Sequence, residues 1–372
     1  MTKQKRKTLP KDFKELLASA DIEALKSFFE TCDVDARGGY TKQTALAFNE
    51  CPDELTRWLV EQGADLAAED NYGETPLHSR AGHWNGSIEL LIELGADVNC
   101  NTDGRGSPLH QAAAVGNLRA AQTLLDHGAL PNATNREGQT PLVFALQRCS
   151  NASIERMAPI AELLLAAMSN TPEKPRSIFG RVFGGGPRRR SPVTREMQGL
   201  VQKIGTQFEF HRAGYNPESV GVASAALDRL YSLFDVAPVP RRALHDGKSP
   251  VVAKAGRWED QHHELWESLV PSSGPARTVQ GEVIRISGRI SDEIERNGGV
   301  NWDGDYRKMA DALLNHIGSG HQLSISELDS ARQAVAGVKH QQGATDELCK
   351  LAVSWVALNP NPIPLSEPEY RR

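Results

Sequence analysis

Three four-residue stretches decide the fold of this chain: Thr75-Pro76-Leu77-His78, Ser107-Pro108-Leu109-His110 and Thr140-Pro141-Leu142-Val143. A degenerate copy, Thr44-Ala45-Leu46-Ala47, precedes them, so successive copies begin 31, 32 and 33 residues apart. A second marker repeats in phase at Gly63-Ala64-Asp65, Gly95-Ala96-Asp97 and Gly128-Ala129-Leu130. Two markers that share one period indicate a tandem repeat of about 33 residues.

The first marker is typical of the start of a helix. The hydroxyls of Thr75, Ser107 and Thr140 can cap a helix, and proline suits the first helical position because no amide donor is needed there. An apolar helical face and then a glycine, such as Gly95 or Gly128, follow each marker, and that glycine can end the helix in a left-handed conformation. Each repeat is therefore predicted to be a helix pair and a turn, which buries its apolar side only by stacking on its neighbours.

This period and the Thr-Pro-Leu-His signature resemble the ankyrin-repeat family over residues 11–168. The resemblance implies about four full or partial repeats, in which His78 and His110 are buried and tie neighbouring repeats together by hydrogen bonds. The repeat that starts at Thr75 is shortened, and the one that starts at Thr140 carries extra residues before its second helix. We therefore expect a small and irregular stack.

The resemblance also implies a surface for binding another protein. In the ankyrin family, partners bind the concave side, built from the turn tips and the exposed positions of the first helices. The alternative for each residue taken singly is a solvated turn position, although aromatic residues and arginine are enriched where binding energy concentrates. Carried over by position, the candidate surface comprises Tyr40, Lys42, Gln43, Asn71, Tyr72, Glu74, Ser79, Asp103, Arg105, Gln111, Arg136, Glu137, Gln139 and Phe144, with Trp84 on the other rim.

The chain is expected to be all-α, an ankyrin-repeat solenoid followed by a separate helical domain. We divide it into a basic tail at 1–10, the ankyrin stack with an N-terminal cap at 11–168, a flexible Gly-, Pro- and Arg-rich linker at 169–193, a helical domain at 194–360 and a C-terminal tail at 361–372. Apolar spacing in the helical domain predicts helices at 217–236, 257–269, 279–294, 304–317, 325–338 and 345–358.

The second half carries three unusual stretches: Leu265-Trp266-Glu267-Ser268-Leu269-Val270-Pro271-Ser272-Ser273-Gly274, Thr278-Val279-Gln280-Gly281-Glu282 and Asn297-Gly298-Gly299-Val300-Asn301-Trp302. They loosely resemble an uncharacterised bacterial helical module, and this resemblance implies no activity. We interpret Thr278 as a helix cap and Glu282 as a carboxylate placed favourably for the helix dipole. An active site at Gln280 and Glu282 is the alternative interpretation.

We predict no catalytic residue, no cofactor and no metal ion. His262 and His263 would point about 100° apart on a helix, and His316 and His321 flank a Gly-Ser-Gly break, so neither pair has a spacing suited to a metal ion. The five cysteines are widely spaced and form no CxxC pair, which fits reduced thiols in the cytoplasm.

Composition narrows the choice of function. The chain has 372 residues, of which 39% are hydrophobic and 24% charged, which is typical of folded globular proteins. Its net charge of -5 argues against a surface wholly committed to nucleic acid, although the arginine-rich linker leaves a minor role of that kind, or on acidic membranes, open. The N-terminus lacks the apolar segment of a secretory signal, and no stretch is long enough to span a membrane.

The function expected from these features is protein binding. We predict a bacterial cytoplasmic protein that engages a protein partner through the concave ankyrin face, in its most specific form an inhibitor or immunity-type protein for a cognate toxin or effector. The alternative is an effector or enzyme, in which the helical domain carries an unrecognised activity and the repeats select its target.

Overall fold

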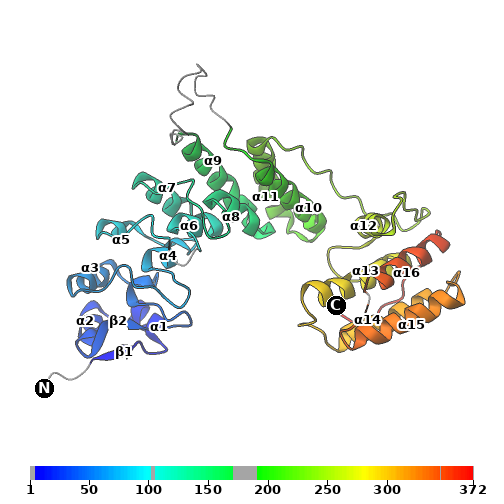
Figure 1. Cartoon of the computed structure of the whole chain (residues 1–372), viewed down its shortest axis with the longest axis horizontal. Coiled ribbons are helices and arrows are strands. Elements are labelled where there is room, and N and C mark those ends of the chain that lie inside the picture. The colour runs from blue at the N-terminus through cyan, green and yellow to red at the C-terminus, as the bar shows by residue number, and fades with distance from the viewer. Residues whose placement is uncertain (1–4, 102–104, 171–190, 344, 372) are drawn as a thin grey trace, which may run out of the picture. The chain divides into compact units, whose positions relative to one another are not determined.

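The computed structural model describes residues 5–101, 105–170, 191–343 and 345–371 (Figure 1). The chain divides into two compact units, the first made of Met1–Phe208 and Asn216–Val239 and the second of Glu209–Tyr215 and Pro240–Arg372. Both are built almost entirely from helices. The expected fold class, an all-α repeat solenoid plus a helical domain, is therefore confirmed.

A helix pair and a small sheet form the N-terminal end of the first unit. Helices α1 (Phe13–Ser19) and α2 (Ile22–Thr31) supply the expected cap, and strand β1 (Arg6–Thr8) pairs in parallel with β2 (Cys32–Arg37). The residues of β1 were expected to belong to a basic tail. The strand is held because the Lys5 ammonium donates to the Phe29 carbonyl over 2.9 Å, and the Arg6 guanidinium lies 5.4 Å above the Phe28 ring.

The repeats follow as helix pairs in two rows, with the first helix of each pair in one row and the second helix in the other (Figure 1). The helices α4, α6 and α8 begin at the proline of each marker, directly after the capping Thr75, Ser107 or Thr140, as predicted. The degenerate first repeat has only a short 3₁₀ turn in that place. The pairs are η1 (Ala45–Ala47) with α3 (Asp53–Glu61), α4 (Pro76–Ala81) with α5 (Glu89–Glu93), α6 (Pro108–Val115) with α7 (Leu118–Asp126), and α8 (Pro141–Arg148), η2 (Asn151–Ser153) and α9 (Ile154–Asn170).

The glycine of the second marker ends each of the helices α3, α5 and α7. Gly63, Gly95 and Gly128 have φ values of 93°, 102° and 87°, in the left-handed region that favours glycine. The residue after each glycine donates its N–H back to the helix, as Ala129 does to the Leu124 carbonyl over 2.9 Å. The glycine therefore acts as the helix terminator that the sequence predicts.

Two further helices extend the first unit beyond the repeats, which differs from the division expected from the sequence. Helices α10 (Arg195–His211) and α11 (Pro217–Phe234), joined by the turn η4 (Arg212–Gly214), were expected to belong to the helical domain that begins at residue 194. Instead α11 packs along α9, where Arg229 forms an ion pair with Glu162, and all but the last turn of α10 belongs to the first unit. The pair covers the apolar side that the last repeat would otherwise expose.

The second unit is a bundle of helices around α13. Helix α13 (Val279–Ser291) is buried on every side from Val279 to Ser287, whereas the sequence pattern predicted one buried face. It continues into a π-helical turn, η5 (Asp292–Arg296). Helices α12 (Trp258–Leu269), α14 (Gly304–Ile317) and α16 (Thr345–Leu358) pack against it, and α15 (Ile325–Lys339) packs against α14 and α16.

The segment after α16 packs against this bundle, although residues 361–372 were expected to form a tail. The Val279 N–H donates to the Ile363 carbonyl over 2.8 Å, and Thr278 and Pro364 form an isolated antiparallel bridge. The side chain of Tyr370 is buried in the same core as α13. The described residues of the C-terminal segment are therefore part of the second unit.

Candidate protein-binding surface

The histidine of the first marker fixes the spacing between repeats. The His78 Nδ1 atom lies 2.8 Å from the Thr75 hydroxyl oxygen, and its Nε2 atom lies 3.1 Å from the Gly106 carbonyl in the next turn. His110 repeats this arrangement with Ser107 and with the Gln139 carbonyl at 3.0 Å. Burial lowers the pKa of both histidines, so both rings are neutral at pH 7. The predicted role of these histidines in tying repeats together is therefore confirmed.

An acidic or amide side chain builds the turn in front of two of these helices. The Asp70 carboxylate accepts from the N–H groups of Tyr72 at 2.7 Å and Glu74 at 3.0 Å. Asn135 does the same for Glu137 and Gln139 in the later turn. These bonds hold the turn tips in a fixed conformation, which lowers the entropy cost of binding through them.

The first such turn carries an aromatic residue under an arginine. The Arg105 guanidinium carbon lies 4.6 Å from the centroid of the Tyr72 ring, in cation–π contact across two neighbouring repeats. Tyr72 remains 37% exposed. Burial raises the pKa of the nearby Glu74 carboxyl, as does the charge of Asp70, and the Arg105 charge opposes both. The structure therefore brings three of the predicted surface residues together.

Two of the predicted surface residues are buried, which corrects the expectation that they are exposed. Phe144 is 6% exposed, because its ring lies between His110, at a centroid distance of 5.7 Å, and Arg148. Gln139 is 9% exposed, and its side chain donates to Gln147 over 2.6 Å. Neither side chain offers a contact area, but both position exposed neighbours on α8.

The remaining predicted surface residues differ in their exposure to solvent. Tyr40 is 89% exposed and Trp84 is 60% exposed, the two highest values among the aromatic residues of the first unit that the structure describes. Ser79 and Gln111 are half-buried on α4 and α6, as is Gln43 in the first turn, whereas Lys42, Asn71, Arg136 and Glu137 are exposed. Asp103 lies outside the described residues. The binding role of all these residues stays a prediction.

The motif residues of the second unit serve its internal structure. The Gln280 side chain donates to the carbonyls of Asn359 and Asn361 at 2.8 and 2.7 Å and accepts from the Ile363 N–H at 3.0 Å. The Glu282 carboxylate accepts from the Ala276 N–H at 2.9 Å and from the Tyr370 hydroxyl at 2.7 Å. Both residues therefore anchor chain segments next to α13 rather than opening onto a cleft.

A bidentate ion pair completes the arrangement around Glu282. Arg285 donates from Nε to one Glu282 oxygen over 2.9 Å and from Nη2 to the other over 2.6 Å, and both side chains are buried. Burial alone would raise the pKa of Glu282, but the bonds and charge of Arg285 outweigh it and lower the pKa. The Glu282 carboxylate is therefore ionised, and both of its oxygens accept hydrogen bonds from within the protein. This agrees with a structural role for the motif rather than with an active site.

The third motif wraps around a second buried carboxylate. Glu293, in the π-helical turn, is 2% exposed. It accepts from the N–H and side-chain amide of Asn301, at 2.6 and 3.2 Å, and from the Asn297 amide at 3.1 Å. The asparagines of the motif are therefore explained by the hydrogen-bonding capacity of one carboxylate.

The histidine pair of α12 forms no metal site. His262 lies 3.0 Å from the Ser287 hydroxyl, which itself donates to the Ile284 carbonyl, while His263 is exposed. Burial lowers the pKa of His262 to about 4, so its ring is neutral. Among the described residues, no group of three or more His, Cys, Asp or Glu side chains is arranged to hold a metal ion.

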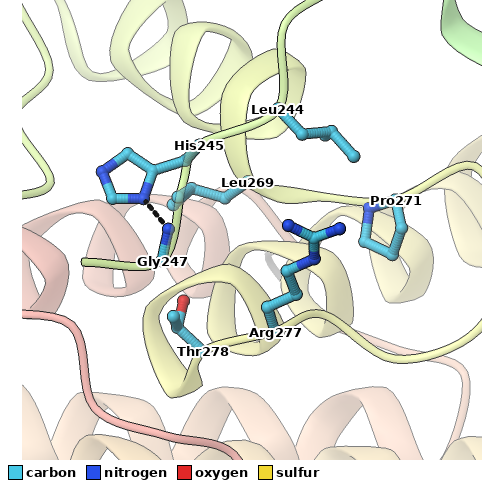
Figure 2. Close-up of a pocket in the computed structure, with 7 residues that line it drawn as sticks. All are labelled: Leu244, His245, Gly247, Leu269, Pro271, Arg277 and Thr278. Atoms are coloured by element: carbon cyan, nitrogen blue, oxygen red, sulfur yellow. Dashed lines mark hydrogen bonds between the residues drawn. The ribbon is translucent and has the colours of Figure 1, made fainter. Parts of the chain in front are cut away.

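A small pocket lies at the start of α13 (Figure 2). The His245 ring accepts a hydrogen bond from the Gly247 N–H over 3.0 Å at its edge. The volume open to solvent molecules is about 20 Å³, room for roughly one water molecule. The lining residues are Leu244, His245, Gly247, Leu269, Pro271, Arg277 and Thr278.

Comparison with known proteins places the similarity in the repeats. The family described as ankyrin repeats (many copies) matches residues 91–145, and the single ankyrin repeat matches residues 72–103. In the described part of the chain, no helix has the length and apolar character that crossing a membrane requires.

The similar proteins match only a part of this chain. The chain is 36% identical over 102 residues to the Ankyrin repeat and SOCS box protein 16 of Mus musculus, which is 25% of this chain and 22% of that protein. It is 41% identical over 98 residues to the Putative E3 ubiquitin-protein ligase XBAT35 of Arabidopsis thaliana, 25% of this chain and 21% of that protein. The B-cell lymphoma 3 protein homolog of Mus musculus is 35% identical over 120 residues, 31% of this chain and 27% of that protein.

The chain thus spans about a quarter of the length of these relatives, and the match says nothing of their other parts. What the matched stretch shares with them is the repeat itself, and ankyrin repeats support a role in protein–protein interaction. Together with the helix pairs, the marker turns and the bridging histidines, the matches show that residues 72–145 are ankyrin repeats.

Proposed function

We propose that the chain binds a partner protein through the turn tips and first helices of its ankyrin stack. The observation that carries this proposal is the Tyr72–Arg105 pair, held at 4.6 Å on a turn that Asp70 fixes by two hydrogen bonds. Aromatic and arginine side chains contribute most to binding energy at protein interfaces, and a rigid mounting reduces the entropy lost on binding. Tyr40 adds a second exposed aromatic ring on the preceding turn.

The size of the surface suits a protein partner. A stable protein–protein interface covers roughly 800 Å² on each partner. The four turn tips and the first helices behind them are repeated at the spacing of packed helices, roughly 10 Å. A row of this length supplies an interface of ordinary size.

In its specific form, the proposal is a bacterial cytoplasmic inhibitor of the immunity type, which covers the active site of a cognate toxin or effector. The second unit supports a binding role over a catalytic one, because its motif residues Gln280, Glu282 and Glu293 are fully engaged in internal hydrogen bonds. We assign the recognition surface to the first unit.

The test is capture of the partner by the full-length chain, followed by surface variants. Tyr72→Ala with Arg105→Ala should release a captured partner, whereas Arg57→Ala with Arg119→Ala, on the other row of helices, should retain it. Equal retention by both double variants would contradict the proposed surface. If the partner is an enzyme, one equivalent of the chain should suppress its activity, and full activity in the saturated complex would rule out the inhibitor form.

A further inference from the structure

We propose that the row of α4, α6 and α8 receives an acidic segment of the partner, and that arginines stacked on aromatic rings bind its carboxylates. This inference rests on the proposed function and names the chemistry of the partner. We call the exposed cations Lys42, Arg105, Arg136 and Arg148 the inner cations, because they lie on the first helices or on the turns that precede them.

Two cations of the other row, on α3 and α7, are already neutralised by carboxylates. Arg57 on α3 pairs with Glu93 at 3.1 Å, and Arg119 on α7 pairs with Glu89 at 2.6 Å. Each pair joins neighbouring repeats. The positive charge of Arg57 and Arg119 is therefore balanced within the protein, at little gain in stability for exposed pairs.

The inner cations differ, because none of them forms an ion pair with any carboxylate in the described part of the chain. Two of them lie on aromatic rings instead: Arg105 on Tyr72 at 4.6 Å and Arg148 on Phe144 at 3.5 Å. Both guanidinium groups remain on exposed residues. Within the described residues, this row therefore presents cations that no ion pair neutralises.

Stacking prepares an arginine to bind a carboxylate. A ring face holds the plane of the guanidinium group but leaves its N–H edge free, and that edge matches the two oxygens of a carboxylate. Because the side chain is already ordered, less rotamer entropy is lost when the carboxylate arrives. The Phe144 ring is buried and packs against His110, so it holds the Arg148 guanidinium in one position.

The charge pattern favours a protein segment over a nucleic acid. Glu74 lies near Arg105, and the exposed Glu137 follows Arg136 directly. These carboxylates would repel a continuous row of phosphates, as would the net charge of -5. A peptide with separated carboxylates meets the cations and avoids the acidic positions.

The spacing of the turns predicts the spacing of the acidic residues. Arg105 and Arg136 occupy the turns in front of α6 and α8, which are neighbouring first helices. Packed helices lie roughly 8–10 Å apart, and an extended chain advances about 3.3 Å per residue. The partner segment should therefore carry acidic residues about three positions apart.

The test uses the full-length chain and a labelled peptide with glutamate at every third position and serine and glycine between. Binding is measured by fluorescence anisotropy at low and at moderate salt. We expect Arg105→Gln and Arg148→Gln each to weaken binding about tenfold, and Tyr72→Leu to weaken it less, because the charge remains. Arg57→Gln and Arg119→Gln should change the affinity by less than about twofold. The salt dependence should fall in the inner variants.

The outcomes separate this inference from the proposed function. No binding of the glutamate peptide, or equal binding of its glutamine counterpart, would overturn the acidic-partner inference. Tighter binding of a single-stranded oligonucleotide, lost in the same arginine variants, would replace it with nucleic acid. A captured protein that needs Tyr40 and Tyr72 but is insensitive to Arg105→Gln and Arg148→Gln would leave the proposed function standing and remove only the acidic segment.

Discussion

The guanidinium carbon of Arg148 lies 3.5 Å from the centroid of the Phe144 ring, whose neighbour on α6 is His110. One buried aromatic ring thus joins the core of the stack to an exposed cation. Stability and surface chemistry depend on the same side chain at this point.

Phe144→Ala should therefore destabilise the chain strongly. The substitution removes a buried ring and leaves a cavity, which costs about 3–5 kcal/mol in the free energy of unfolding. Arg148→Gln should cost less than about 1 kcal/mol, because the guanidinium is exposed. Urea unfolding of both single variants and the double variant gives their coupling energy, expected at about 0.5–1 kcal/mol. Additive single effects would show that the stacking contributes nothing to stability.

His110→Ala should loosen the contact between two repeats. The substitution removes the donor to the Gln139 carbonyl and leaves that buried oxygen without its partner, which costs about 1–3 kcal/mol. His127→Ala is a matched control, because that histidine is exposed and bonds only within its own helix. Hydrogen exchange should show faster opening around α8 in the first variant alone. Equal exchange in both variants would contradict the bridging role.

Much of this stack could be predicted from the sequence, because its markers are local. The period, the proline after each helix cap and the terminating glycines are sequence-adjacent features whose geometry repeats. The exposure of residues at the turn tips, such as Tyr72 and Arg105, follows from their position relative to these markers. The burial of Phe144 could not be predicted in this way, because it depends on His110 in the preceding repeat.

The second half of the chain is less predictable from its sequence. Apolar spacing indicates which residues of a helix are buried but not which neighbour covers them, so α11 was assigned to the wrong unit. Motif residues are equally ambiguous. Gln280 and Glu282 could have lined an active site until the structure placed the C-terminal segment against them.

Stability should fall as the pH drops below neutrality. Burial lowers the pKa of His78 and His110 in the folded chain. As the pH falls, these histidines therefore take up protons in the unfolded chain before they do so in the folded chain, near the ordinary histidine pKa of about 6.5. The stability that depends on neutral rings is therefore present above about pH 6.5 and lost below it. Each histidine contributes at most about 1.4 kcal/mol per pH unit. Urea unfolding at pH 7, 6 and 5 should show a smaller loss for His110→Gln than for the wild-type chain, and parallel losses would refute this assignment.

Glu282→Ala should be among the most damaging changes in the second unit. It leaves the buried Arg285 guanidinium without its counter-charge, which costs about 3–5 kcal/mol. Tyr370→Phe removes only one hydroxyl donor to the same carboxylate and should cost about 1 kcal/mol. Hydrogen exchange in the second variant should rise in the C-terminal segment first. A loss as small for Glu282→Ala as for Tyr370→Phe would show that the ion pair is not the main support of this core.

A pair of glycines gives opposite predictions for the same substitution. A Cβ atom at Gly86, in the shortened repeat, would lie 1.9 Å from the Arg80 carbonyl oxygen, so the backbone must move. Gly199 lies within α10, and a Cβ atom there meets nothing within 4 Å. Gly86→Ala should therefore lower the free energy of unfolding by more than about 2 kcal/mol, by strain in the turn that carries Trp84. Gly199→Ala should raise it by about 0.5–1 kcal/mol, because alanine loses less backbone entropy in a helix. Thermal unfolding of the two variants measures both effects, and a stable Gly86→Ala variant would show that the shortened turn is not fixed by this close approach.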